Sequence, residues 1–241
     1  SMAASGVTLG VTDASFGLLI GSSGIVFQGD GSLTLTGGGF GGVHADTVSL
    51  RYNNTGTAYS GHSLAFASDY SYTFSNMPAS TSFQAASVSG LRASVGDAIS
   101  INGDFGFEVD DTANTMTVVS HNATAKAVAG DFGVGVENAD LGLFFSSAGR
   151  VLEARGGLYV NLGDQVSLSA DTVAVRWNTT SVDFSNEALT AAGLGYTYGP
   201  GLVAGLQEVA IGGASLNGGS GSVLPSGTAV RATFMTIASS A

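Results

Sequence analysis

Cysteine is missing from this chain of 241 residues, and its absence excludes disulfide bonds and thiolate metal sites. Basic residues are few: six arginines and Lys126 stand against 18 acidic residues, for a net charge of −11. Such a chain repels a phosphate backbone, so we expect no nucleic-acid partner. No apolar run reaches the roughly 18 residues of a membrane-spanning helix, and the first residues do not have the basic-then-apolar order of a signal peptide. We therefore expect no membrane insertion.

Groups for acid–base or nucleophilic catalysis are also scarce. The three histidines, His44, His62 and His121, are scattered and match no zinc-binding spacing. No serine lies in a Gly-x-Ser-x-Gly turn. The remaining enzymatic pattern is a pair of carboxylates, as a polysaccharide-active enzyme would use. Its candidates are Glu108, Asp110 and Asp111. They stand where a solvated turn is expected, so we predict no catalytic residue and no enzyme.

Calcium is the cation that the acidic composition favours most. Aspartates that follow a glycine in a turn can offer carboxylate and carbonyl oxygens to a hard cation. These aspartates are Asp30, Asp97, Asp104, Asp131 and Asp164. Neither the EF-hand spacing nor the Gly-Gly-x-Gly-x-Asp nonapeptide occurs. The sequence therefore predicts no cofactor, with calcium as the alternative and no defined set of metal ligands.

The strongest positive signal is an internal duplication. The segment 11–55 aligns without a gap on 136–180, with 17 identical residues in 45 positions. The match is sharpest where Ala45-Asp46-Thr47-Val48 meets Ala170-Asp171-Thr172-Val173. A weaker match pairs 100–103 with 215–218. A long internal period is typical of arrays in which each unit packs on the next.

Alternation of apolar and polar residues predicts strands throughout the chain, with little helix. In 46–53 and 171–178 the apolar residues are Val48, Leu50, Tyr52, Val173, Val175 and Trp177. We expect them to face the core, and the polar residues between them to face water. The same pattern predicts core faces at 70–74 and 105–109. Glycine-rich turns, for which the 37 glycines are well suited, are predicted about every ten residues, for example at 21–24, 29–31, 102–104 and 146–149.

Some polar residues recur in both copies. Arg51 and Arg176 are each followed by Asn, and we interpret them as a polar ladder on a strand face, with an exposed ligand patch as the alternative. Three Asn-x-Thr triplets, at 53–55, 122–124 and 178–180, match the acceptor of N-glycosylation, a match that occurs often by chance.

Two architectures satisfy these patterns. The first is an elongated, solenoid-like or rolled β-rod of two tandem repeats, residues 1–125 and a shorter 126–241, packed continuously on one another. The second is a pair of tandem β-sandwich modules. The segment between the copies, 124–130, is small and apolar rather than rich in proline and serine, which favours the continuous rod.

The pattern Asp-Thr-Val-x-Val/Leu-Arg-aromatic-Asn-x-Thr, at 46–55 and 171–180, resembles the repeat units of very large bacterial extracellular proteins of the adhesin-like, haemolysin type. The resemblance implies a cell-surface or secreted location, neighbouring repeats as partners, and a structural or spacer role that extends or displays other domains. The alternative that we retain is an adhesion or carbohydrate-binding module, with surface glycans or other surface proteins as ligands. The calcium nonapeptides that accompany such repeats are absent, and no functional residue can be carried over.

Overall fold

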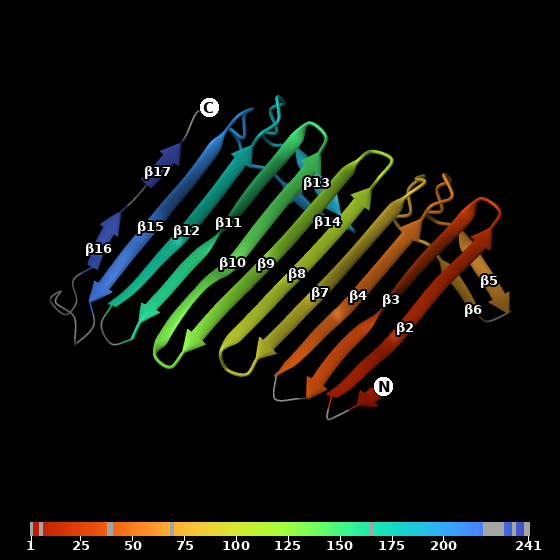
Figure 1. The fold of residues 1–241 in the computed structure, drawn as a ribbon, viewed down its shortest axis with the longest axis horizontal. Coiled ribbons are helices and arrows are strands. Elements are labelled where there is room, and N and C mark those ends of the chain that lie inside the picture. Colours follow the sequence, from red (N-terminus) through yellow and green to blue (C-terminus); the bar gives the residue numbers. More distant parts are fainter. Residues whose placement is uncertain are drawn as a thin grey trace.

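The computed structural model describes residues 2–4, 7–37, 41–67, 70–163, 166–218, 229–232 and 235–238. All regular structure in this part of the chain is β-strand, so the prediction of an all-β fold is confirmed. Since no helix is present there, none is long and apolar enough to cross a membrane. Ten long strands make most of the fold (Figure 1). They are β2 (Val7–Gly21), β3 (Gly24–Gly37), β4 (Gly42–Asn53), β7 (Phe83–Val95), β8 (Ile99–Asp110), β9 (Thr115–Ala129), β10 (Phe132–Ser146), β11 (Gly149–Leu162), β12 (Val166–Asn178) and β15 (Gln207–Gly218).

The long strands form one antiparallel sheet, in which each strand pairs with the next long strand along the chain. Three short strands complete the edges: β1 (Met2–Ala4) pairs with β2, while β16 (Ala229–Ala232) and β17 (Met235–Ala238) both pair with β15. Residues of both duplicated segments therefore lie in a single sheet of 13 strands rather than in two sandwich modules. The boundary expected between residues 125 and 126 falls inside β9, which pairs with β8 on one side and β10 on the other.

Strand bounds recur along the sheet at a nearly constant offset. β10 and β11 begin and end 125 residues after β2 and β3. The irregularity between Thr12 and Ser15 recurs between Glu137 and Asp140, at the same offset. The weaker match of 100–103 with 215–218 is wrong, because the first segment lies in β8 whereas the second lies in β15, which pairs with β12 as β7 pairs with β4. Below, β2–β8 is called the first half and β10–β17 the second half.

Two short hairpins lie across one face of the sheet, behind it in Figure 1. The first is β5 (Ser63–Ala67) with β6 (Tyr70–Thr73), and the second is β13 (Ala188–Ala191) with β14 (Leu194–Thr197). Each hairpin buries aromatic side chains against the sheet. One hydrophobic cluster contains Val26, Tyr72, Phe74, Met77, Phe83, Ala85 and Ala192, and the other contains Val119, Val151, Ala191, Tyr196, Tyr198 and Leu202. We call the covered side the hairpin face and the opposite side the open face.

The prediction of which strand residues face the core is wrong for β4, β8 and β12. In β4 the polar Arg51 and Asn53 are buried on the hairpin face, with 7% and 0% of their surface exposed, whereas Leu50 is 50% exposed. Trp177 of β12 and Phe107 of β8 are likewise exposed, at 40% and 47%. The alternation itself is present, but the hairpins cover the polar side. The expectation holds for the first hairpin and the loop after it, where Tyr72 and Phe74 are buried.

Some of the predicted turns are confirmed and others are wrong. The turns at 21–24 and 146–149 connect β2 with β3 and β10 with β11, as expected. The glycines of 29–31 and 102–104 instead lie inside β3 and β8, next to irregularities in strand pairing. Glycine within a strand relaxes the pleat and permits such a bulge, so a glycine-rich segment alone does not mark a strand end.

Candidate functional site: the hairpin face and the open face

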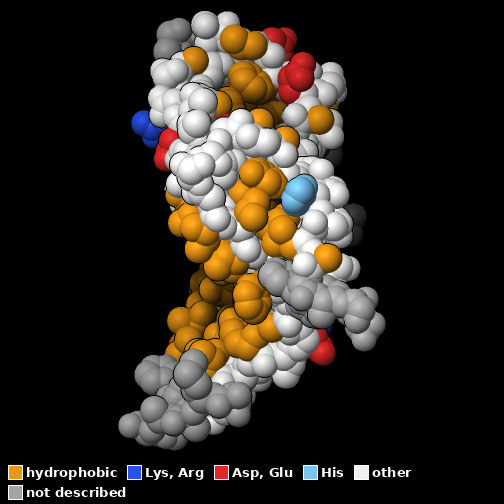
Figure 2. All heavy atoms as spheres, turned by 90° about the vertical axis from the view of Figure 1, so that its right-hand side faces the viewer, with side chains coloured by type: hydrophobic (Ala, Val, Ile, Leu, Met, Phe, Trp, Pro, Cys, Tyr) orange, Lys and Arg blue, Asp and Glu red, His pale blue; other side chains and the backbone are white. Residues whose placement is uncertain are grey.

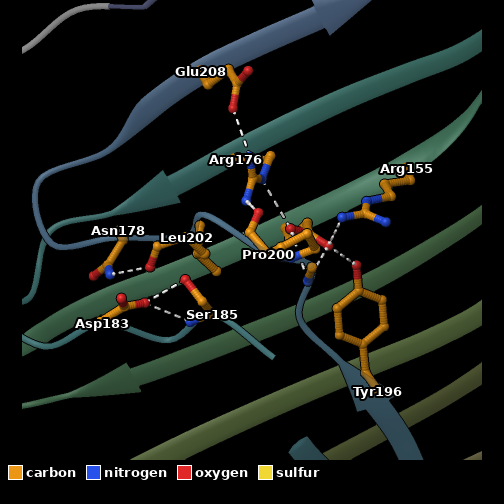
Figure 3. Close-up of polar contacts among 11 residues, drawn as sticks. Arg155, Arg176, Asn178, Asp183, Ser185, Tyr196, Pro200, Leu202 and Glu208 are labelled. Carbon is orange, nitrogen blue, oxygen red and sulfur yellow. Dashed lines mark hydrogen bonds and ion pairs between the residues drawn. The ribbon is translucent and has the colours of Figure 1, made fainter. Parts of the chain in front are cut away.

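A buried carboxylate organises the hairpin face of the second half, and Figure 3 shows Arg155, Arg176, Tyr196 and Glu208 among the residues of this region. Glu153 of β11 is fully buried, forms an ion pair with Arg155 at 2.8 Å and accepts a hydrogen bond from the Arg176 Nε at 3.0 Å. The Tyr196 hydroxyl donates to the same carboxylate at 2.9 Å, and the Gly199 N–H donates at 3.0 Å. Both oxygens of this buried carboxylate thus have cationic or hydrogen-bonding partners, which is the condition for an ion pair inside a fold.

Arg176 is shared between two carboxylates and a loop. Its Nη1 donates to Glu208 of β15 at 2.8 Å, and its Nη2 donates to the Pro200 carbonyl at 2.5 Å. The loop after β14 is therefore held to the sheet by a guanidinium group. A side chain at Gly199 would place its Cβ 1.8 Å from an Arg155 nitrogen, so any other residue there would push the Arg155 guanidinium away from Glu153.

The tyrosines over this cluster are held in their neutral form. Burial, and then the negative charge of Glu153, raise the pKa of Tyr196 and of Tyr198 well above its ordinary value. The Tyr196 hydroxyl serves as a donor to Glu153, a role that only the neutral form can fill.

In the first half, the residues paired with Arg51 on the neighbouring strands are not carboxylates. Gln28 and Ala85 flank Arg51 on the neighbouring strands, as Glu153 and Glu208 flank Arg176. The Arg51 Nη2 instead donates to the carbonyl of Ala192, at 2.6 Å. The Arg51 Nε and Nη1 atoms have no hydrogen-bond partner among the described residues.

Ala192 belongs to the turn of the second hairpin, so this contact joins the two halves. Its N–H donates to the Glu108 carboxylate at 3.0 Å while its C=O accepts from Arg51. We call this arrangement the Ala192 clamp: one peptide of the second half is gripped by a cation and an anion of the first half. Ala192 has a positive φ of 52° and is 3% exposed, so the turn is seated inside the first hydrophobic cluster.

Gly106 allows the turn of the second hairpin to pack close against β8. A Cβ at this position would lie 2.3 Å from the Ala191 carbonyl oxygen, a separation that backbone atoms cannot accommodate. The strand glycine therefore marks the place where a second backbone approaches the sheet. The approaching backbone belongs to Ala191, a residue 85 positions further along the chain.

The three candidate carboxylates have separate structural roles. Glu108 is part of the Ala192 clamp. Asp110 accepts hydrogen bonds from the Thr112 N–H at 2.9 Å and from Ser80 at 3.1 Å, and so shapes the turn between β8 and β9. Asp111 accepts from the Ser82 hydroxyl.

The histidines and the glycine-linked aspartates are dispersed over the molecule. His44 lies 2.8 Å from Asp46, His62 packs edge-on against Tyr59, and His121 lies 2.7 Å from the Gly195 carbonyl oxygen. Of the aspartates considered for calcium, Asp30 lies in β3, Asp104 in β8, and Asp97 and Asp131 in turns, while Asp164 is outside the described residues. Within the described ranges, no group of three or more His, Asp or Glu side chains is placed to hold a metal ion.

A polar groove of about 470 Å³ lies on the second half, between β10, β11 and β12. Its lining includes Glu137, Asp140, Arg155, Tyr159 and Asp171. The Lys126 ammonium lies over the Tyr159 ring, 5.9 Å from its centre. At the offset of 125, the first half has Thr12, Ser15, Asp30, Thr34 and Asp46 at these positions. The first half therefore has different residues at most of the positions that line this groove.

Among the residues that the structure describes, the open face is almost free of charge. One row of directly paired residues crosses it as Phe16, Gly29, Leu50, Ala86, Phe107, Val118, Leu143, Leu152, Trp177 and Gln207. Further along the strands, another row reads Leu9, Leu35, Val43, Ala93, Ile101, Ala125, Val136, Leu158, Ala170 and Ala214. Figure 2, seen along the sheet from the β2 edge, shows hydrophobic side chains gathered on the hollowed side, away from the hairpins.

Many of these side chains are exposed in the described part of the chain. Phe16, Leu50, Phe107, Trp177 and Val136 are all between 40% and 60% exposed. A hollow of about 410 Å³ on this face, over β2, β3 and β4, is lined by Val11, Phe16, Phe27, Leu33, Val48 and Leu50 among others. The open face is thus a large hydrophobic surface, of the kind that marks an interaction site.

No protein-family model, no curated protein sequence and no solved structure matches this chain.

Proposed function

We propose that the chain is a structural segment of a repetitive bacterial surface or secreted protein. In this proposal two copies of one unit join through a shared sheet, and the resulting body holds other domains apart. The units correspond to the first and second halves defined above. The role is mechanical: the work is done by buried contacts that keep the halves in register.

The observation that carries the proposal is the Ala192 clamp. The turn of the second hairpin completes the hydrophobic core of the first half, since Ala192 packs with residues such as Phe74 and Phe83. A peptide held at 2.6 Å and 3.0 Å by opposite charges resists sliding in either direction along the sheet. Together with the continuous strand pairing from β8 through β10, this contact couples the halves into one body.

The test is whether the two halves unfold together. Hydrogen exchange, followed by mass spectrometry at increasing urea concentration, reports β3 and β11 separately. We expect both strands to open in one cooperative transition in the native chain. In the Glu108→Ala variant we expect β3 to open at lower urea than β11. The reason is that the hydrogen bond from the Ala192 N–H, which holds the turn of the second hairpin against the first half, is lost. Glu187→Ala, an exposed loop substitution, is the control and leaves the transitions coincident. Separate transitions in the native chain would refute the structural role.

A second candidate function is glycan binding at the polar groove, the adhesion module of the sequence analysis. The groove combines carboxylates, a guanidinium group and the Tyr159 ring, which are groups that sugars use for hydrogen bonds and stacking. The test is a glycan array with the native chain, repeated with Tyr159→Ala and with the matched Thr34→Ala of the first half. Binding that Tyr159→Ala abolishes and Thr34→Ala retains supports this candidate; an array without signal removes it.

A further inference from the structure

We propose that the open face is the interface between two copies of this chain, which stack their sheets face to face. The inference is independent of the structural role proposed above, because it concerns the side of the sheet that the hairpins do not touch. It rests on the extent of the open face, on the distribution of charge between the two faces, and on the shape that two identical sheets present to one another.

The open face is far larger than a monomer can leave uncovered at low cost. At about 4.8 Å between strands and about 3.3 Å per residue, ten strands of at least 12 residues span roughly 43 Å by 40 Å, or about 1,700 Å². The largest apolar patch on an ordinary monomer is roughly 300–600 Å². A stable protein–protein interface needs only about 800 Å² from each partner. The open face therefore has the size of a permanent interface.

The two faces differ sharply in charge. In the region of the hairpins, Arg51, Glu108, Glu153, Arg155, Arg176 and Glu208 all belong to the hairpin face. On the open face, the paired rows through Leu50 and Ile101 contain no charged residue, and Arg150, stacked 6.0 Å from the Trp177 ring, stands at the end of the sheet. Stacking two open faces keeps the acidic groups of each copy, with a net charge of −11, on the outside and apart.

A second copy also supplies the matching shape. Two sheets with the same twist pack aligned, at about 30° to one another and about 10 Å apart, with side chains of both inner faces interdigitated. The occupant must offer an uncharged apolar face of equal extent and twist, and another copy of the chain does so by construction. The pairing is isologous, so it closes at two copies. It also places Val48, Leu50 and Tyr52 inside a core, which is where their alternation in the sequence predicts them to be.

Trp177 provides a native reporter, since it is the single tryptophan and lies on the open face with 40% of its surface exposed. Sedimentation and light scattering over a thousandfold dilution should give twice the chain mass of 23.9 kDa at micromolar concentration. In the dimer, Trp177 emission should be blue-shifted and acrylamide quenching reduced at least threefold relative to the most dilute sample. The proposal is overturned if the native chain is monomeric at every concentration and acrylamide quenches Trp177 emission as strongly in concentrated samples as in the most dilute one.

Charge placed at the centre of the face should dissociate the dimer. Leu50→Lys and Phe107→Lys each bury an unpaired charge in the interface, so we expect the dissociation constant to rise at least 100-fold. Both side chains are half-exposed in the single chain, so folding should be retained, and far-ultraviolet circular dichroism checks this. Val203→Lys, an exposed loop substitution, is the matched control and should leave the dimer intact.

The same measurements identify other occupants. A mass that grows beyond two copies, with Trp177 still open to acrylamide, would mean pairing through sheet edges and would overturn the proposal. A chain that remains monomeric alone but shows a Trp177 blue shift with phosphatidylcholine vesicles would assign the open face to a lipid surface and equally overturn it. If Leu50→Lys, Phe107→Lys and Val203→Lys all leave the mass of a dimer unchanged, the dimer uses another surface and the proposal is wrong.

Discussion

Asn53 and Asn178 stand 125 residues apart and make the same contacts in the two halves. Each side chain is fully buried. The Asn53 Nδ2 donates to the carbonyls of Thr57 and Pro78, both at 2.7 Å, while its Oδ1 accepts from the Thr55 N–H at 3.0 Å. Asn178 donates to the carbonyls of Val182 and Leu202 and accepts from the Thr180 N–H at 3.0 Å. The conformation of the loop that leads to each hairpin is thus fixed by one amide.

We expect Asn53→Ala and Asn178→Ala each to destabilise the chain by about 2–3 kcal/mol. The substitution leaves two carbonyls and an N–H without a partner inside the protein, and such groups carry the full cost of lost hydration. Urea unfolding monitored by circular dichroism gives the free energy of unfolding. Ser147→Ala, in the exposed turn between β10 and β11, is the control and should change it by less than about 0.5 kcal/mol. Equal stability of all three variants would contradict the assigned role.

The same two residues show why sequence patterns mislead as glycosylation signals here. Asn53 and Asn178 begin Asn-x-Thr triplets, but their amides are buried and bonded, so the folded chain offers no acceptor at either position. The threonine of each triplet has a structural purpose, because its hydroxyl donates to the asparagine Oδ1 at 2.8 Å. The triplet recurs because the loop needs both residues.

The sequence predicts the strands well and their faces badly. Alternation around Leu50 and Trp177 locates β4 and β12, and glycine–serine turns locate the ends of β2 and β10. Alternation shows that the two faces of a strand differ, but not which face is covered. Which face is covered depends on hairpins β5–β6 and β13–β14. Their aromatic residues pack on the polar side because Gly17 and Gly142 leave room there. The Ala192 clamp was beyond prediction, since it joins residues 84 and 141 positions apart.

Gly17 and Gly142 give a direct test of this account. A Cβ at Gly17 would lie 2.3 Å from Tyr72 Cδ1, and one at Gly142 would lie 2.3 Å from Tyr196 Cδ1. We therefore expect Gly17→Ala and Gly142→Ala each to cost about 2 kcal/mol or more, because the buried ring must move. Gly10→Ala is the matched control in β2, with no neighbour closer than 3.8 Å. Thermal unfolding that ranks Gly10→Ala equal to the other two would show that the rings do not pack on these glycines.

The buried Glu153 distinguishes the two halves energetically. Glu153→Gln removes the charge that faces Arg155 and Arg176, so we expect a loss of about 2–4 kcal/mol, even though Arg176 keeps Glu208. The reciprocal Gln28→Glu places a carboxylate on the strand next to Arg51 and should cost less than Glu153→Gln, since the guanidinium has two unpaired nitrogens to offer. Free energies of unfolding at neutral pH decide this. Glu187→Gln, on an exposed loop, is the control for loss of one charge.

Stability at high pH should depend on Tyr196 and Tyr198. Their pKa values are raised in the folded chain by burial and by the charge of Glu153, whereas the unfolded chain ionises its tyrosines at the ordinary value near 10. The stabilisation is therefore fully present below pH 10 and is lost as the pH rises above 10, because only the unfolded state releases these protons. With two such hydroxyls, the free energy of unfolding should fall by about 2.7 kcal/mol for each pH unit above 10.

Urea midpoints at pH 8, 10 and 11 measure this slope. Lys126 is the one lysine of the chain, so few basic side chains could contribute to this slope. Tyr196→Phe with Tyr198→Phe should flatten the dependence above pH 10, at the expense of the hydrogen bond to Glu153, which lowers stability at every pH. Absorbance at 295 nm should show Tyr196 and Tyr198 ionising only as the chain unfolds, and a folded native chain in which these two tyrosines ionise near pH 10 would place their hydroxyls in water instead.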